Sequence, residues 1–346
     1  MLGTVSAMLP AVRTASGFVI LFLALVLPGL SAHAQTAIND VHITPRAKPV
    51  DVATTGYATD PAASLGTGSL IRTSVNLVMV PVTITDERYR PVIGLDQENF
   101  QLFEGKKAQQ IKHFSSEDAP ISVGILVDAS GSMSYKLDRA REAVAQFCDT
   151  ANPQDEFFLI TFAEEPILAT DFTNRPEQLE SDLLTARSKG RTALIDAVYM
   201  AIQKMRNARY GRKALLILSD GGDNHSRYSE HDVKAAVKEA DVLIYAVGTY
   251  DSYVSTQEEL LGPELLQEMA ALTGGHAFSL SNINEMPDVT KAIGTELRYQ
   301  YLLTYQPQLP PHDGKWHKIS VKLRLPRRFN IFAHVEARPG YYADHQ

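Results

Sequence analysis

The stretch VGILVDASGS (residues 123–132) decides the fold, because an uninterrupted apolar run ends there in a carboxylate and two hydroxyls. Such a run, without polar alternation, is typical of a strand buried on both faces of a sheet. Two similar runs follow, ALLILSD (214–220) and VLIYAVG (242–248), and segments with helical spacing of apolar residues lie between the runs. This alternation predicts a doubly wound, Rossmann-like α/β domain with a mainly parallel sheet over residues 120–298.

Two β-rich segments flank this domain. Residues 70–118 precede it and residues 299–346 follow it, and both contain apolar residues at every second position. In the second segment, Tyr299, Tyr301, Leu303 and Tyr305 are expected to share one face of a strand. Neither segment has enough strands to be stable alone, so we predict that they pair into one small β-sandwich.

The first 34 residues have the features of a targeting segment. The apolar run FVILFLALVLPGL (18–30) precedes Ala32-His33-Ala34, whose two alanines are the small residues suited to cleavage before Gln35. As a helix the run would span roughly 20 Å, short of the roughly 30 Å hydrocarbon core. We predict a signal peptide over residues 1–34, with a permanent anchor as the alternative, and a linker over residues 35–69.

Composition narrows the classes of function. The formal net charge of −7 argues against a nucleic-acid-binding protein, which would carry a basic face. The predicted signal peptide implies export to the periplasm or the cell exterior. No other segment is apolar enough to span a membrane, so the mature protein is expected to have no transmembrane segment. Cys148 is the only cysteine, which excludes an internal disulfide, and its place on an apolar helix face predicts a buried thiol.

Oxygen-bearing side chains follow the predicted buried strands and precede a buried helix. They come from three fragments, with Asp128, Ser130 and Ser132 in the first, Thr192 in the second and Asp220 in the third. Ligands of doubly wound sheets bind at the carboxyl ends of the strands. Carboxylates and hydroxyls suit Mg²⁺, Mn²⁺ or Ca²⁺ better than Zn²⁺, which prefers nitrogen and sulfur.

These fragments resemble the metal-ion-dependent adhesion site of von Willebrand factor A domains, in which D-x-S-x-S is followed by a threonine and a later aspartate. The resemblance implies that Ser130 and Ser132 bind the cation directly, and that Thr192 does so directly or through water. Asp128 and Asp220 would act mostly through water or by supporting the ligands. Mg²⁺ is the expected cation, and its open position would accept a carboxylate of a protein partner. The whole chain is similar to a family of exported bacterial proteins related to these domains.

Three classes of function compete. The first is a non-enzymatic, metal-dependent binding protein for adhesion or assembly, and the second is a regulatory or scaffold subunit of a larger complex. The third, a hydrolase, would need a G-x-S-x-G elbow or a histidine with an orienting partner, and neither is evident. The run Asp223-Asn224-His225 is interpreted as a solvated loop, with a role in ligand choice as the alternative.

Overall fold

The computed structural model describes residues 77–87, 90–249, 257–307, 313–325 and 333–343. The predicted signal peptide, the predicted linker and the first residues of the amino-terminal β segment lie outside these ranges. Within them, the structure has no helix that combines the length and the apolar character needed to cross a membrane.

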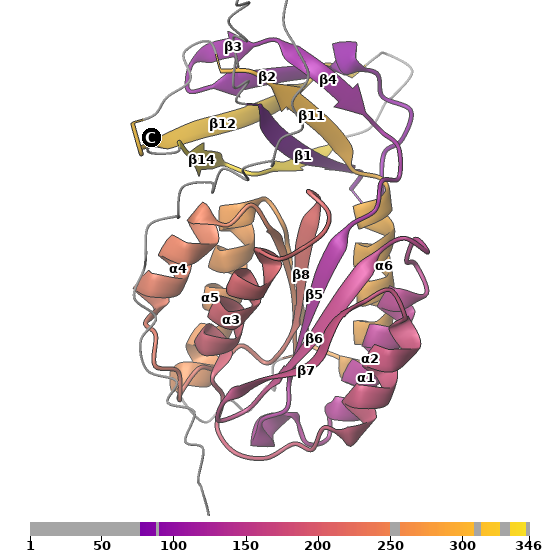
Figure 1. The fold of residues 1–346 in the computed structure, drawn as a ribbon, viewed down its shortest axis with the longest axis vertical. Helices are drawn as coiled ribbons and strands as arrows, with labels where there is room; N and C mark the ends of the chain where they lie inside the picture. The colour runs from indigo at the N-terminus through magenta and orange to yellow at the C-terminus, as the bar shows by residue number, and fades with distance from the viewer. Residues whose placement is uncertain (1–76, 88–89, 250–256, 308–312, 326–332, 344–346) are drawn as a thin grey trace, which may run out of the picture. The chain divides into compact units, whose positions relative to one another are not determined.

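A six-stranded sheet forms the centre of the α/β domain (Figure 1). Its strands are β5 (Ser122–Asp128), β6 (Glu156–Phe162), β7 (Pro166–Thr173), β8 (Lys213–Leu218), β9 (Leu243–Thr249) and β10 (Ala277–Leu280), in the spatial order β10-β9-β8-β5-β6-β7. Neighbouring strands are parallel except for the β6–β7 pair. The predicted doubly wound, mainly parallel sheet is therefore confirmed, and strand order reverses between β5 and β8.

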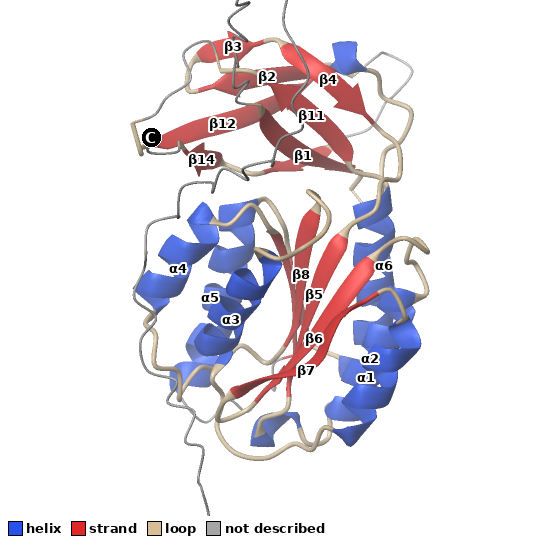
Figure 2. Cartoon of the chain, in the orientation of Figure 1, coloured by secondary structure: helices blue, strands red, loops and turns tan. Residues whose placement is uncertain are grey.

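Helices cover both faces of this sheet (Figure 2). They are α1 (Leu137–Cys148), α2 (Pro176–Thr185), α3 (Leu194–Met205), α4 (Glu230–Glu239), α5 (Gln257–Thr273) and α6 (Met286–Arg298), with short 3₁₀ turns η1 (Gln97–Asn99), η2 (Gly131–Met133) and η3 (Ile283–Glu285). Two separate apolar cores result, one beneath α1, α2 and α6 and the other beneath α3, α4 and α5. Helix α6 was not part of the sequence-based prediction, although Pro287 lies in its first turn, where proline is tolerated.

Two four-stranded antiparallel sheets surround the core of the β-sandwich. One has the order β13-β1-β11-β4 and the other β14-β12-β2-β3. The strands are β1 (Val78–Thr85), β2 (Phe100–Glu104), β3 (Lys107–Gln109), β4 (Ile111–Ser115), β11 (Tyr301–Tyr305), β12 (Trp316–Leu323), β13 (His334–Ala337) and β14 (Gly340–Tyr342). Strands from the two flanks are neighbours in both sheets, since β1 pairs with β11 and β2 pairs with β12.

The prediction that Tyr299 shares a face with the other tyrosines of this segment is wrong. Tyr301, Leu303 and Tyr305 are buried in the sandwich core, whereas Tyr299 precedes β11 and is 47% exposed. The helix α6 ends at Arg298, so Tyr299 lies in the connection and does not follow the alternation of the strand.

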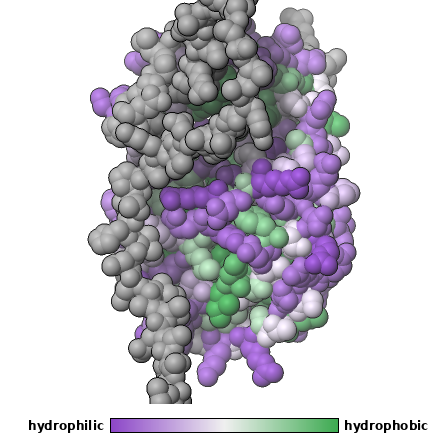
Figure 3. Space-filling view, viewed as in Figure 1, coloured by the Kyte–Doolittle hydropathy of each residue, from purple (hydrophilic) through white to green (hydrophobic). Residues whose placement is uncertain are grey.

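The surface is mostly hydrophilic and the single cysteine is buried, as the composition and the sequence pattern predict. The described part of the face in Figure 3 is mostly hydrophilic with interspersed apolar area, as expected of a surface in contact with water. Cys148 is buried, as predicted, and burial raises the pKa of its thiol to about 12. The thiolate, the reactive form, is therefore scarce at neutral pH.

A buried polar cluster joins the α/β domain to the sandwich. The Tyr245 hydroxyl of β9 donates to Glu296 Oε1 over 2.7 Å, and Gln300 Nε2 donates to Thr83 Oγ1 of β1 over 3.2 Å. His276 and Glu336 form an ion pair of 3.0 Å beside them. Burial is the main cause that raises the pKa of Glu296 to about 7, and the hydrogen bond from Tyr245 opposes this rise.

The substitution Glu296→Gln is expected to reduce the loss of stability that accompanies a rise from acidic to neutral pH. Because the pKa of Glu296 in the folded protein exceeds its ordinary value of 4.5, wild-type stability falls as pH rises from about 4.5 to about 7. The amide still accepts the hydroxyl of Tyr245 but carries no charge. Urea unfolding at pH 5 and pH 8 should show a difference between the two pH values that is smaller by about 1–2 kcal/mol in the variant. The control is Glu239→Gln at an exposed position of α4, and equal differences in both variants would contradict the prediction.

Candidate metal-binding site

The loops that carry the five predicted site residues meet at the carboxyl edge of the six-stranded sheet, where strand order reverses. The Ser219 hydroxyl donates to Asp128 Oδ2 over 2.6 Å, which connects the ends of β8 and β5. The Gly131 amide donates to the Gly190 carbonyl over 3.0 Å, which brings in the loop before α3. Parallel strands present their carboxyl ends at one edge, so residues far apart in sequence converge there.

Asp128 is buried and its orientation is determined by two hydrogen bonds. Oδ1 accepts the Ser130 amide over 2.8 Å, and Oδ2 accepts the Ser219 hydroxyl. Burial, followed by the nearby carboxylate of Asp220, raises the pKa of Asp128 to about 7, and the hydrogen bonds from Ser130 and Ser219 only partly offset this. A cation at this edge would offset both effects on the pKa of Asp128, because a nearby positive charge favours the ionised form of a carboxylate.

Ser130 and Ser132 bring their hydroxyls together on the 3₁₀ turn η2. Their Oγ atoms are 3.0 Å apart, with Ser130 buried and Ser132 half-buried. Among the described residues, neither hydroxyl has a hydrogen bond to a histidine. The pair provides two neighbouring neutral oxygen ligands, the type that Mg²⁺ and Ca²⁺ bind.

Thr192 is held by the loop after β8. Its amide donates to Asn224 Oδ1 over 3.0 Å, and its carbonyl accepts the amides of Asn224 and His225. Asp223 accepts the amide of Ile195 in the first turn of α3 over 2.8 Å. The run is a loop in which Asn224 and His225 are exposed and Asp223 is half-buried, as the interpretation of a solvated loop expects. Asp223 and Asn224 also accept hydrogen bonds from residues distant in sequence, which local composition does not reveal.

The substitution Asn224→Ala is expected to weaken cation binding roughly tenfold, the lower end of the usual effect when a residue that supports a metal ligand is removed. The backbone bonds to Thr192 remain, which limits the loss. Mn²⁺ titration followed by calorimetry measures it, with His225→Ala as the control because the His225 side chain is exposed. Equal affinities in the two variants would show that Asn224 does not support the site.

Lys136 is a further residue at this edge that the predicted set did not include. It is buried, and its Nζ lies 3.7 Å from Asp220 Oδ2 and donates to the Thr249 carbonyl over 3.3 Å. A signal existed in the sequence, because Lys136 is three residues from Met133 and four from Ala140, both buried. A lysine on the apolar stripe of a helix start indicates a buried partner for its charge.

The donor set fits a hard divalent cation. Among the described residues, no group of three or more His, Cys, Asp or Glu side chains could hold a metal ion. A cation at this edge would therefore depend on hydroxyls and water together with Asp128 and Asp220. Mg²⁺ commonly binds in this way, through one or two carboxylates and several waters.

A surface groove adjoins this edge. It has a volume of about 480 Å³ and is lined by residues that include Ala129, Ile167 and Arg187. Ala129 directly follows Asp128, so the groove begins one residue away from the candidate metal site. Ile167 and Arg187 are exposed on its rim and offer both apolar and cationic contacts.

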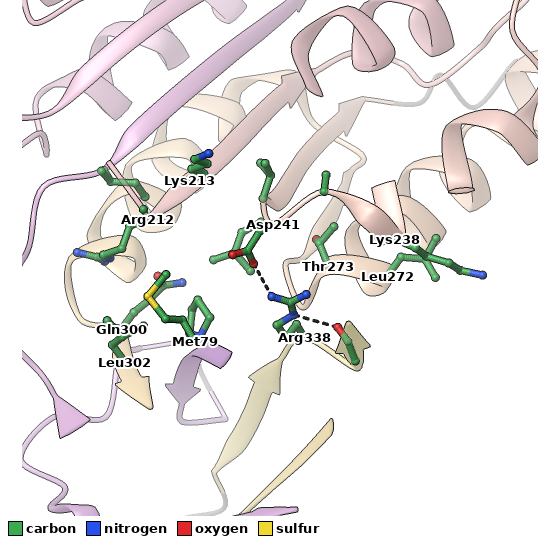
Figure 4. Close-up of a pocket in the computed structure, with 17 residues that line it drawn as sticks. Met79, Arg212, Lys213, Lys238, Asp241, Leu272, Thr273, Gln300, Leu302 and Arg338 are labelled. Carbon is green, nitrogen blue, oxygen red and sulfur yellow. Dashed lines mark hydrogen bonds and ion pairs between the residues drawn. The ribbon is translucent and has the colours of Figure 1, made fainter. Parts of the chain in front are cut away.

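The hollow in Figure 4 lies at the opposite edge of the sheet, beside the sandwich. Met79, Leu272 and Leu302 contribute apolar surface, and an ion pair between Arg338 and Asp241 lies at its side. The free space in it is only about 30 Å³. This volume corresponds to roughly one water molecule, so the hollow is a packing seam.

Comparison with protein families decides what this domain is. The model described as von Willebrand factor type A domain matches residues 122–292. Residues 122–292 are a von Willebrand factor type A (VWA) domain. VWA domains typically mediate protein–protein interaction or adhesion.

Two curated relatives match part of this chain. Inter-alpha-trypsin inhibitor heavy chain H4 of Bos taurus is 31% identical over 127 residues, which cover 32% of this chain and 14% of the relative. A UPF0353 protein of Mycolicibacterium gilvum is 26% identical over 204 residues, covering 51% of this chain and 61% of the relative. The chain thus spans less than two thirds of either protein.

One solved structure has similar coverage of both chains. The von Willebrand factor type A protein of Catenulispora acidiphila aligns with 79% of this chain and 74% of its own, at 12% identity and a TM-score of 0.47.

Proposed function

We propose that this VWA domain binds a divalent cation, Mg²⁺ above all, and uses it to capture a carboxylate of a protein partner. Ser130, Ser132 and Thr192 would supply ligand oxygens, while Asp128 and Asp220 balance the charge and orient water. The protein would be exported and would act without catalysis in adhesion or assembly.

One observation carries the proposal: Asp128 is buried beside Asp220, next to two hydroxyls whose oxygens are 3.0 Å apart. Two buried carboxylates repel each other, and their burial in a low dielectric is costly unless positive charge compensates it. A cation bound by the short hydroxyl side chains at the carboxyl edge of the sheet would supply this positive charge. Solvent and a partner could reach the cation there. Neutral hydroxyl ligands leave that cation electron-poor, which favours an incoming carboxylate.

Calorimetric titration of the full chain with MgCl₂ and MnCl₂, after treatment with chelator, tests the first half. We expect saturable uptake of one ion per chain and weaker uptake by Thr192→Val, which keeps the size of the side chain and loses its oxygen. The exposed Thr185, at the end of α2, supplies the matched control Thr185→Val. No uptake by the wild type at millimolar concentration would contradict the proposal.

Water-proton relaxation of the Mn²⁺-loaded chain tests the second half. A carboxylate that enters the open position of the ion displaces a bound water, so acetate should lower the relaxivity. Acetamide has a similar size and no charge, and it should have no effect. If both additives act equally, the ion has no preference for an acidic ligand.

A further inference from the structure

Lys136 places a second positive charge at the candidate metal site. Its side chain is only 3% exposed, and its Nζ lies 3.7 Å from Asp220 Oδ2. The same Nζ donates to the carbonyl of Thr249, the last residue of β9. Lys136 comes four residues after Ser132 and directly before α1, so it connects the loop of the hydroxyls to the ends of β8 and β9.

Lys136 compensates part of the negative charge of the two aspartates at this edge. Asp128 and Asp220 together carry two negative charges when ionised, and both are buried. A buried carboxylate without a partner is strongly unfavourable, and removal of one member of a buried ion pair leaves the other uncompensated. The ammonium of Lys136 reduces the net charge of the group to −1 before any other ion arrives. A lysine with only a packing role would not need to point its charge at Asp220.

We propose that Lys136 is a resident counter-ion of Asp220. It keeps the metal-site carboxylates in place when no divalent cation is bound, and its charge weakens the binding of such a cation. The first role is independent of the proposed function, and the second rests on it. A site of this kind exchanges its cation without unfolding, because Lys136 already balances one of the two carboxylates.

A double-mutant cycle in chelator tests the first role. Full-length wild type, Lys136→Met, Asp220→Asn and the double variant are compared by thermal unfolding in EDTA. Lys136→Met alone should lower Tm by about 5–10 °C, since it leaves Asp220 buried and unpaired. The same change should cost much less in the Asp220→Asn background. Equal losses of Tm in both backgrounds would overturn the proposal.

A Lys136→Met chain that does not fold is also informative. The double variant should then fold in EDTA, because it carries neither the ammonium nor the carboxylate that the ammonium balances. Failure of the double variant to fold would show that Lys136 acts by packing, and would overturn the counter-ion role.

Mn²⁺ titration tests the second role. Lys136→Met should bind the ion about tenfold more tightly than wild type, because a like charge beside the ion is removed. The control Lys234→Met removes an ion-paired lysine of α4 and should leave the affinity unchanged. Equal or weaker affinity in Lys136→Met would overturn this role. If wild type takes up no cation, the proposed function fails, and the cycle in EDTA still decides the first role.

Discussion

Asp128→Asn is expected to reduce the affinity for Mn²⁺ and Mg²⁺ by more than about 100-fold, the upper end of the effects seen when a residue that orients a metal's ligands is replaced. Asp128 supplies one of two negative charges at the site and orients Ser130 through its amide. Asparagine has nearly the same shape but lacks the charge, so the loss isolates the electrostatic contribution. Calorimetric titration with MnCl₂ measures it.

The fold of Asp128→Asn should survive in the absence of metal. Burial and Asp220 both disfavour the ionised carboxylate, so the neutral amide relieves a cost that the wild type bears. The amide oxygen still accepts a hydrogen bond from Ser130 or Ser219. We expect a Tm in EDTA no lower than that of wild type within a few degrees, and Asp138→Asn, exposed on α1, is the control for both measurements. Wild-type affinity in Asp128→Asn would contradict the metal-site proposal.

Gly262→Ala is expected to destabilise the protein although alanine favours helices. Gly262 lies in α5, where the backbone of Gly221 approaches so closely that an added Cβ would be 2.4 Å from the Gly221 carbonyl carbon. Backbone atoms cannot rotate away, and Gly221 has a φ of +80° that few other residues adopt. A cost of about 3 kcal/mol for overpacking exceeds the gain of about 1 kcal/mol in helix propensity.

The same change should weaken Mn²⁺ binding at least about tenfold, because Gly221 directly follows Asp220 and a shift of one moves the other. Urea unfolding and metal titration measure the two effects. Gly211→Ala is the control, since its added Cβ would meet only Met79 Cε at an ordinary 3.5 Å. A more stable Gly262→Ala protein would show that α5 is free to move away from the site.

Local patterns in the sequence were sufficient for the α/β core. The runs of β5, β8 and β9 are apolar throughout because strands buried between two helical layers have no solvent-facing side. The helix α3 (Leu194–Met205) carries apolar residues at helical spacing, so it is one of the helical segments that the alternation with apolar strands indicates. The helix α6, on the other face of the sheet, was not predicted, and its burial depends on contact with α1.

The sequence by itself determined that Asp128 and Asp220 lie at the carboxyl ends of parallel buried strands, that Ser130 and Ser132 follow the first of them, and that Thr192 precedes a buried helix. Strand ends share an edge in any doubly wound sheet, so their proximity follows from topology. Only the tertiary structure decided which side chains support them. Lys136 reaches Asp220 across 84 positions of sequence, and Asn224 holds Thr192 from 32 positions away. Such contacts depend on the path of each loop in space, which local propensity does not specify, and on the charge that burial requires each partner to balance.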